Sequence, residues 1–223
     1  MVDNRILLIE SPISRAMLIK KEGVSISESV LTELQNLPEG ITDESILIKG
    51  IVQRADIENK NRRIYPWRIL EKERIRLTNL IESGVGGIIG ELDHSDQNSV
   101  SLRGSSVAIR KLWWEGKDLV AIAELLDPHY NANAGIAYSI LKAGMPLGIS
   151  SRGLGSLNYM DGTNIVQEDY EMVCWDLVSD PSTHSAYMRS IPVQKIKEEV
   201  ENNLVIPKGS SSLDSLIKAF LWE

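Results

Sequence analysis

Residues 146–156 read PLGISSRGLGS, and no other stretch of the chain says as much about its fold and function. Three glycines and three serines surround a single arginine, Arg152, directly after a segment with helical periodicity. This composition is typical of a turn or a surface loop. It also suits a cradle of backbone N–H groups at Gly153-Leu154-Gly155, or a serine nucleophile whose neighbouring glycines let a substrate approach closely.

The overall composition excludes several classes of protein. The chain has 223 residues, 43% of them hydrophobic, which suits one medium domain with tails or two small domains. A formal net charge of -7 argues against a general nucleic-acid binder, which normally has a basic face. The single cysteine, Cys174, rules out an intrachain disulfide and a zinc site made of several thiolates. Without a membrane-spanning apolar stretch or a signal peptide, we expect a soluble intracellular protein.

Changes in composition divide the chain into three parts. We expect an N-terminal extension at 1–45, a central domain at 46–194, and a linker with a C-terminal amphipathic helix at 195–223. The central part contains short β-rich runs, a hairpin turn at Glu115-Gly116-Lys117-Asp118, and helical patterns in WRILEKERIRLTNLIES and NAGIAYSILKAGM. This pattern predicts an α+β fold, with a small antiparallel β-barrel or curled sheet covered by helices.

Three histidines limit the acid–base chemistry. His94 follows an apolar strand in the sequence GELDH, where a rigid element could hold an active-site group. His129 and His184 lie in predicted turns, where a solvated histidine is the common case. The two carboxylates of GELDH could bind a metal together with His94. On a strand, however, they would face away from the imidazole, so we expect no metal site.

A serine hydroxyl becomes a nucleophile only beside a base and beside donors for the developing oxyanion. Ser150 and Ser151 lie between glycines, but the spacing is not the G-x-S-x-G elbow of α/β-hydrolases, and no strand is expected directly before them. The acid that orients the base would be Asp176, which interrupts an apolar strand and is costly there unless it is paired. Asp56 is the alternative. The residues alone leave a loop, an anion site and a catalytic site open.

Several segments, in order, resemble one protein family. GELDH, KLWWEGKDL, AGMPLGISSRGLGS and WDLVSDPS, with ENKNRRIYPWRILEK upstream, are similar to the prohead core serine proteases of T-even-type tailed bacteriophages, over about Ile46 to Pro181. The resemblance implies a β-barrel wrapped by helices and related to the herpesvirus capsid-maturation protease, assemblin. It also implies a serine endopeptidase that cleaves scaffold or core proteins and the major capsid protein. This would happen in the host cytoplasm, inside the immature phage head.

The resemblance also assigns roles to individual residues. His94 of GELDH would be the general base and Ser150 of GISSRG the nucleophile, with Ser151 as the alternative. We expect Asp176 as the acid in preference to Asp56. This sequence departs from the family pattern, which has a proline after the histidine, by having Ser95 there.

Substrate contacts follow from the same resemblance. Backbone N–H groups near Arg152 and Gly153 would bind the oxyanion. Family members cleave after glutamate with leucine or isoleucine two residues earlier, and a pocket for glutamate needs a cation. Arg152, Arg103 and Arg110 are the candidates for that cation.

The cleavage preference recurs near both ends of the chain, at Leu8-Ile9-Glu10 and at Leu221-Trp222-Glu223, so we expect self-processing of a zymogen. We expect no cofactor, no metal, no membrane and no nucleic acid partner, and a homo-oligomer is conceivable. Two alternatives come from other classes: a non-catalytic capsid scaffold component of the same fold, and a small anion-binding regulatory module that uses the Gly/Ser segment.

Overall fold

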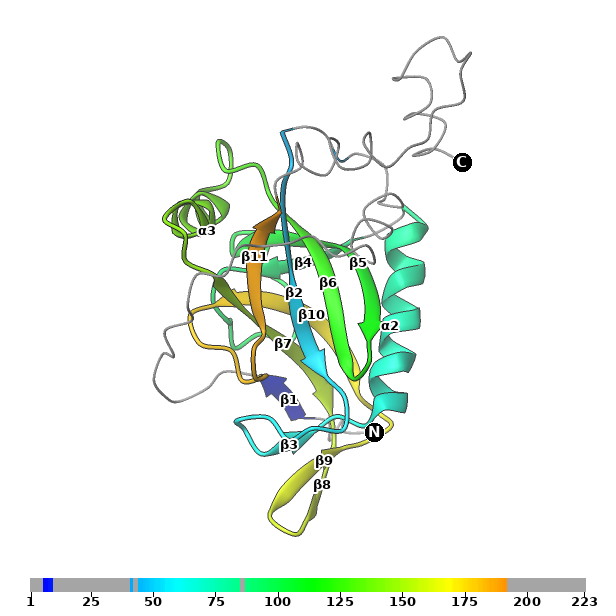
Figure 1. The fold of residues 1–223 in the computed structure, drawn as a ribbon. Helices are drawn as coiled ribbons and strands as arrows, with labels where there is room; N and C mark the ends of the chain where they lie inside the picture. The colour runs from blue at the N-terminus through cyan, green and yellow to red at the C-terminus, as the bar shows by residue number, and fades with distance from the viewer. Residues whose placement is uncertain (1–5, 10–40, 42–43, 85–86, 192–223) are drawn as a thin grey trace, which may run out of the picture.

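A curled antiparallel sheet forms the centre of the protein (Figure 1). The structure is a computed structural model that describes residues 6–9, 41, 44–84 and 87–191. The strands follow one another in the order β1-β7-β11-β2-β6-β5-β4, and β10 pairs with the opposite edge of β7. Their bounds are β1 Ile6–Ile9, β2 Ile46–Arg54, β4 Ile88–Glu91, β5 Ser105–Glu115, β6 Asp118–Leu125, β7 Leu147–Gly155, β10 Glu171–Val178 and β11 Tyr187–Ile191.

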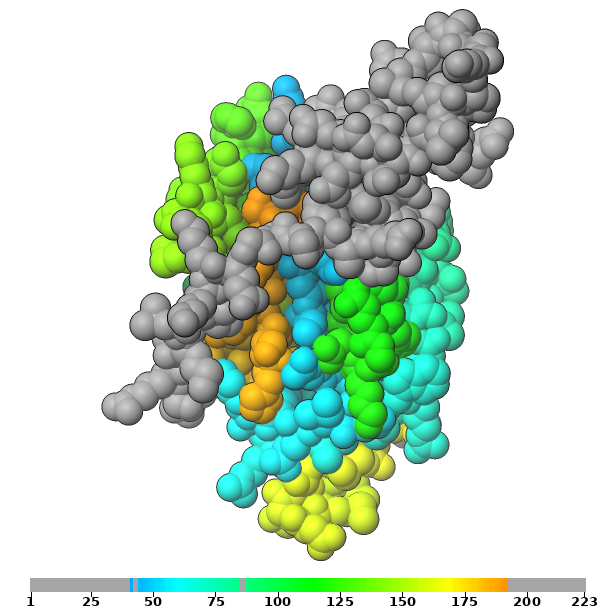
Figure 2. Space-filling view, in the orientation of Figure 1, coloured from blue at the N-terminus to red at the C-terminus, as the bar shows by residue number. Residues whose placement is uncertain are grey.

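The sheet nearly closes into a barrel, because the end of β4 meets β10. Leu92 forms a parallel bridge with Leu177, and the Asp93 N–H donates to the Leu177 carbonyl at 2.8 Å. A separate sheet of three strands, in the order β3-β9-β8, projects at one end (Figure 2). Its strands are β3 Arg63–Ile64, β8 Leu157–Met160 and β9 Thr163–Val166. The predicted α+β class with an antiparallel barrel-like core is confirmed; the herpesvirus relation stays a prediction.

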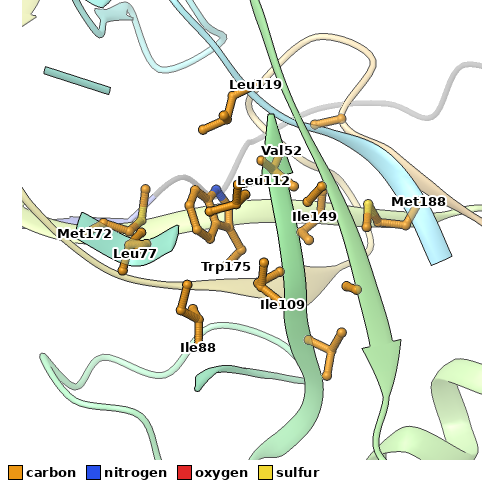
Figure 3. Packing of buried hydrophobic residues seen from close by; sticks show 14 of the residues in the cluster. Val52, Leu77, Ile88, Ile109, Leu112, Leu119, Ile149, Met172, Trp175 and Met188 are labelled. Atoms are coloured by element: carbon orange, nitrogen blue, oxygen red, sulfur yellow. The ribbon is translucent and has the colours of Figure 1, made fainter. Parts of the chain in front are cut away.

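Apolar side chains from alternate strand positions fill the interior of the barrel. Trp175 lies at its centre among side chains that include Ile109 and Ile149 (Figure 3). Each aliphatic side chain buried in this way stabilises the fold by roughly 1.5–3 kcal/mol. Because side chains alternate along a strand, the neighbours of Trp175 on β10 must leave the interior, and this alternation creates a polar face.

Helix α2 (Trp67–Glu82) packs against β5, as the amphipathic pattern predicts, and its buried face joins the core inside the curled sheet (Figure 1). Its buried face contains Ile69 and Leu77, and Ser83 and Gly84 follow its last turn, with Gly84 at a φ of 65°. The same face also buries Glu73, whose carboxylate accepts the backbone N–H of Met172 at 2.8 Å. This contact joins α2 to β10.

The second predicted helix and the predicted hairpin are also confirmed. α3 spans Ala132–Lys142, and the Asn131 side chain caps its first turn by accepting the Ala134 N–H at 2.8 Å. In the hairpin, Glu115 of β5 pairs with Asp118 of β6. Gly116, at a φ of 63°, supplies the left-handed conformation that this turn needs.

The segment PLGISSRGLGS is not a loop, and this expectation was wrong. Leu147–Gly155 forms β7, a central strand with neighbours on both edges. The expected cradle of free N–H groups at Gly153–Gly155 is wrong for the same reason, because β1 and β10 pair with these residues. The glycines instead permit close packing. A Cβ on Gly148 would lie 2.5 Å from the Val178 carbonyl oxygen, and one on Gly153 would lie 2.8 Å from that of Glu171.

Strand β1 lies within the predicted N-terminal extension and yet adds to the central sheet. The predicted C-terminal part, 195–223, lies outside the described residues, as does most of 1–45. Within the part of the chain that the structure describes, no helix is both long and apolar enough to cross a membrane.

Candidate active site

The register between β7 and β10 decides which side chains share a face. Ser150 lies opposite Asp176, and Arg152 lies opposite Cys174. Residues directly opposite each other in an antiparallel pair have side chains on the same face, so these four form one polar cluster. Ser151 lies opposite Trp175, so its side chain is on the face that lines the apolar interior.

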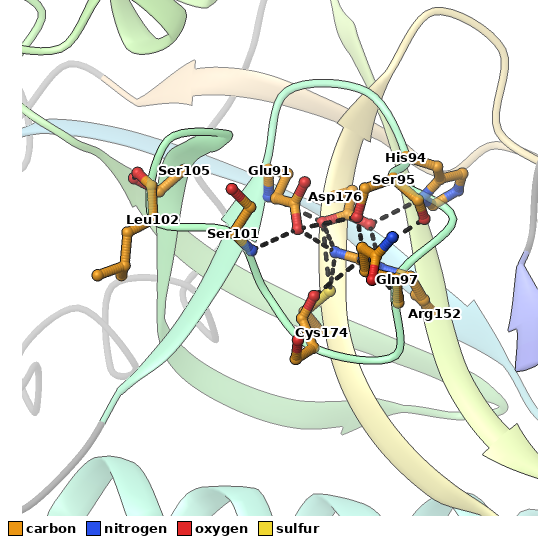
Figure 4. A network of polar contacts seen from close by, with 11 residues as sticks. Glu91, His94, Ser95, Gln97, Ser101, Leu102, Ser105, Arg152, Cys174 and Asp176 are labelled. Carbon is orange, nitrogen blue, oxygen red and sulfur yellow. Dashed lines mark hydrogen bonds and ion pairs between the residues drawn. The ribbon is translucent and has the colours of Figure 1, made fainter.

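A segment that we call the histidine loop, residues 92–104, connects β4 to β5 and crosses this polar face (Figure 4). The chain turns at Asp93, whose φ of 62° is a left-handed conformation that aspartate tolerates better than most residues. After this turn His94 Nδ1 lies 2.7 Å from Asp176 Oδ2. The structure therefore brings together two residues that are 82 positions apart in sequence.

Asp176 has no exposed surface, and its carboxylate is fully engaged. Oδ1 accepts the Glu91 N–H at 2.8 Å and the Cys174 thiol at 3.2 Å, and it also contacts Arg152. Burial raises the pKa of Asp176, but the hydrogen bonds from His94 and the Glu91 N–H, together with the Arg152 charge, outweigh it, so the pKa lies below its ordinary value. An ionised Asp176 acts as the acceptor, so Nδ1 of His94 is the donor in their hydrogen bond.

Arg152 is completely buried, and its guanidinium contacts two buried carboxylates. Its Nη2 donates to Glu91 Oε1 at 2.7 Å, and its Nε lies 3.1 Å from Asp176 Oδ2 as a charge contact. Burial lowers the pKa of Arg152, and the Glu91 hydrogen bond and the nearby charges raise it by more, so the guanidinium is always charged. This placement does not fit the expectation that the Arg152 side chain binds substrate glutamate.

Ser150 is 2% exposed, and its hydroxyl makes no hydrogen bond to any described residue. A buried polar group without a partner is uncommon and costs stability, so such a group is a candidate for function. Ser151 Oγ is also buried and unbonded among the described residues, but it shares its face with Trp175 rather than with Asp176.

Comparison with known proteins identifies the family. The family described as prohead core protein serine protease matches residues 7–198. The chain belongs to this family. A relative, the prohead core protein protease of Enterobacteria phage T4, is 34% identical over 147 residues, which are 64% of this chain and 68% of that protein. The structure of the bacteriophage T4 capsid assembly protease, gp21, matches with a TM-score of 0.59 and 29% identity, over 80% of this chain and all of the T4 chain.

The other candidate residues of this prohead protease lie away from the site. Asp56 Oδ1 accepts the Trp67 N–H at 2.9 Å, at the start of α2, so Asp56 serves the helix end rather than a histidine. His129 is largely exposed and contacts Asp127, and His184 is exposed. The described residues contain no group of three or more histidines, cysteines and carboxylates that could hold a metal ion.

Two residues of the protease take part in the site in ways that their sequence context does not predict. Glu91 fits a metal ligand by its sequence, yet it is the buried partner of Arg152. Ser95 departs from the family pattern, yet its hydroxyl contacts both Arg152 and Glu91. The available signal was a glutamate inside the apolar run IIGEL, because a buried carboxylate requires a buried cation.

Proposed function

We propose that the protein is a serine endopeptidase with Ser150 as nucleophile, His94 as general base and Asp176 as the orienting acid. The observation that carries this proposal is the 2.7 Å contact between His94 and the buried Asp176, with Ser150 opposite Asp176 on the same face. An ionised acid bound to Nδ1 of a histidine is the arrangement that a catalytic triad requires. The same register favours Ser150 over Ser151.

The mechanism follows from these positions. Asp176 holds the proton of His94 on Nδ1, so Nε2 has the lone pair that removes the Ser150 proton. Ser150 Oγ attacks the substrate carbonyl, and His94 then gives the proton to the leaving amine. Water hydrolyses the resulting acyl-enzyme with His94 again as base. The Asp176 charge stabilises the imidazolium that forms twice in this cycle.

The backbone of β7 suggests the donor for the oxyanion. Ile149 donates its N–H to the Ala186 carbonyl at 3.0 Å, on the side of β7 away from β10. Backbone N–H groups alternate along an antiparallel strand, so the Ser151 N–H faces the same side. There no described strand pairs with Ser151, because β11 pairs with residues 147–148 and β1 with residues 152–155. We assign the oxyanion contact to the Ser151 N–H in place of the paired Gly153.

The substrates that we propose are scaffold or core proteins and the major capsid protein inside the immature head, cut after glutamate with leucine or isoleucine two residues earlier. Membership of the prohead family and the T4 capsid assembly protease support this proposal. Of the three cations considered for binding substrate glutamate, Arg152 is buried and Arg110 is bound to Glu124 at 2.7 Å. Arg103 is exposed in the histidine loop and is the first cation to test.

Self-processing after Glu10 is supported by the position of β1. This strand runs antiparallel to β7, with Ile9 opposite Arg152, two residues from the nucleophile. Antiparallel pairing with an enzyme strand is a common way to hold an extended peptide. Two sequences inside the central domain also fit the preference, Leu80-Ile81-Glu82 and Ile122-Ala123-Glu124. They are placed less well for cleavage, because Glu82 ends α2 and Glu124 lies within β6.

The test is cleavage of a peptide with the preferred sequence, together with intact mass measurement of the protein. We expect wild type to cut the peptide and to begin at Ser11, whereas Ser150→Ala does neither. Ser151→Ala is the matched control and keeps cleavage within a few-fold. Equal cleavage by wild type and Ser150→Ala would reject the proposed nucleophile. Identical N-termini in the two proteins, with peptide cleavage lost only in Ser150→Ala, would reject self-processing alone.

A further inference from the structure

We propose that Arg152 is a positioning residue of the protease. In this proposal its ion pair with Glu91 forms a buried clamp that holds the histidine loop over Asp176. The inference rests on the proposed triad and goes beyond it, because it assigns a role to two residues that do not contact substrate. Four features of the histidine loop and of the clamp carry it.

The first feature is that the histidine loop has no apolar anchor after His94. Residues 95–104 read SDQNSVSLRG, none of them is buried, and none lies in a helix or a strand. Leu102, the largest apolar side chain of this segment, is 78% exposed. Ordering such a segment costs backbone entropy, and apolar burial offsets little of it, because Leu102 is exposed and Val100 is only half-buried. Polar contacts must therefore hold the loop.

The second feature is that the Arg152 guanidinium supplies these contacts on one side. Its Nη1 donates to the Gln97 carbonyl at 2.9 Å and to the Ser95 hydroxyl, with longer contacts to the carbonyls of Ser95 and Ser99 (Figure 4). Hydrogen bonds from a charged donor are about twice as strong as neutral ones. One buried cation thus gathers three loop residues.

The third feature is that Glu91 completes the clamp from the end of β4. Its Oε1 accepts the Ser101 N–H at 2.8 Å and the Ser95 hydroxyl at 3.2 Å, as well as the Arg152 guanidinium. Gly104 leaves room for this carboxylate, because a Cβ there would lie 2.7 Å from Glu91 Oε2. Both ends of the loop are therefore tied to the same ion pair.

The fourth feature joins the clamp to the acid. Arg152 Nη2 lies 3.2 Å from Asp176 Oδ1, and Nε lies 3.1 Å from Oδ2, the oxygen that His94 contacts. The groups that face Asp176 are His94, Glu91, Cys174 and Arg152, and Arg152 is the permanent cation among them. Burial raises the pKa of Asp176, and the Arg152 charge is one of the contacts that lower it. Only a planar guanidinium can serve the loop, Glu91 and Asp176 together.

The main experiment compares Arg152→Met with Arg152→Lys in the full chain, with kcat and KM measured against pH on the preferred peptide. We expect kcat to fall about 100-fold or more in Arg152→Met, because small misplacements of catalytic groups cost this much, with KM within a few-fold of wild type. When the solution is acidified, Arg152→Met should lose activity at a higher pH than wild type does, because without the Arg152 charge Asp176 takes up a proton more easily. Arg152→Lys keeps a charge but not the fork, so it should restore the pH profile and leave kcat low. A raised KM with unchanged kcat would overturn the proposal and assign Arg152 to substrate binding.

A second pair of variants covers the case in which Arg152→Met does not fold. Ser95→Ala removes one ligand of the clamp, and Asp96→Asn is the matched control, an exposed neighbour in the same loop. We expect Ser95→Ala to lower kcat several-fold and to speed amide hydrogen exchange in residues 94–101, with no change in Asp96→Asn. Unchanged exchange and unchanged kcat in Ser95→Ala would refute the clamp. Full activity in Ser150→Ala would reject the proposed triad, whereas the hydrogen-exchange data would still test whether the clamp orders the histidine loop.

Discussion

Replacing Asp176 by asparagine removes one negative charge from the interior of the protease and keeps nearly the same side-chain shape. The asparagine oxygen can still accept the hydrogen bond from the Glu91 N–H, which in wild type binds Asp176 Oδ1 at 2.8 Å. The amide nitrogen then faces His94 Nδ1, where the carboxylate oxygen lies at 2.7 Å in wild type. An amide donor at this place forces Nδ1 to accept, so Nε2 carries the proton and cannot take one from Ser150.

Two magnitudes follow for Asp176→Asn. Loss of the correct tautomer lowers kcat by roughly 10⁴-fold in a serine triad, which corresponds to about 5 kcal/mol of barrier. Removal of one partner from a buried ion pair costs about 3–5 kcal/mol of folding free energy. We expect the lower end of that range, because Glu91 still binds Arg152 at 2.7 Å. Peptide cleavage measures the first effect, and urea unfolding measures the second.

The matched control is Asp56→Asn, which tests the other acid considered from the sequence. Asp56 accepts the Trp67 N–H at the exposed start of α2, so its replacement should cost about 1 kcal/mol of stability or less and leave kcat within a few-fold. The reasoning would be refuted if Asp176→Asn folded and lost less than about tenfold in kcat. It would equally be refuted if Asp56→Asn suffered the larger loss.

Three further predictions concern stability and reactivity. Burial raises the pKa of Asp176, but the groups that face it lower the pKa by more, so it lies below its ordinary value. The stability that ionised Asp176 contributes should therefore be complete above about pH 4, the ordinary pKa of an unfolded aspartate, and should be lost as the pH falls through its pKa in the folded protein. Urea unfolding across pH should show this loss in wild type and not in Asp176→Asn, and equal slopes would contradict it. Gly90→Ala should destabilise the protein by about 3 kcal/mol or more, because the new Cβ would lie 1.8 Å from the Trp175 carbonyl oxygen, whereas Gly87→Ala meets no atom within 4 Å and should be nearly neutral in the same assay. Burial raises the pKa of the Cys174 thiol, so iodoacetamide should label the protein only after unfolding; rapid labelling of the native protein would show that the site is open.

Local signals predicted those parts of the protein whose conformation depends on nearby residues. The amphipathic pattern of α2 and the Glu115–Asp118 hairpin need only their own periodicity and turn chemistry. The cost of burying a carboxylate pointed to Asp176 before any partner was known. The pairing of Asp176 with His94 needed more, because the bridge between Leu92 and Leu177 that aligns them joins distant parts of the chain.

The segment PLGISSRGLGS shows why the rest could not be predicted from local signals. Its glycines and serines are typical of loops, but in the fold its glycines are needed because the backbones of neighbouring strands approach closely. A Cβ on Gly148 or Gly153 would collide with the backbone oxygens of Val178 and Glu171, which lie 30 and 18 positions away in sequence. The role of Arg152 was missed for a related reason. Its nearest carboxylate, Glu91, is 61 positions away, and only the contact between β4 and β10 in the nearly closed barrel brings the two together.

The most direct test of the proposed triad is covalent labelling of the processed protein with a fluorophosphonate, followed by peptide mass mapping. This reagent reacts with a serine only when a base activates it. The proposal predicts a single adduct on Ser150 and none in His94→Ala. An adduct on Ser151, or no adduct on a protein that still cleaves the peptide, would contradict it.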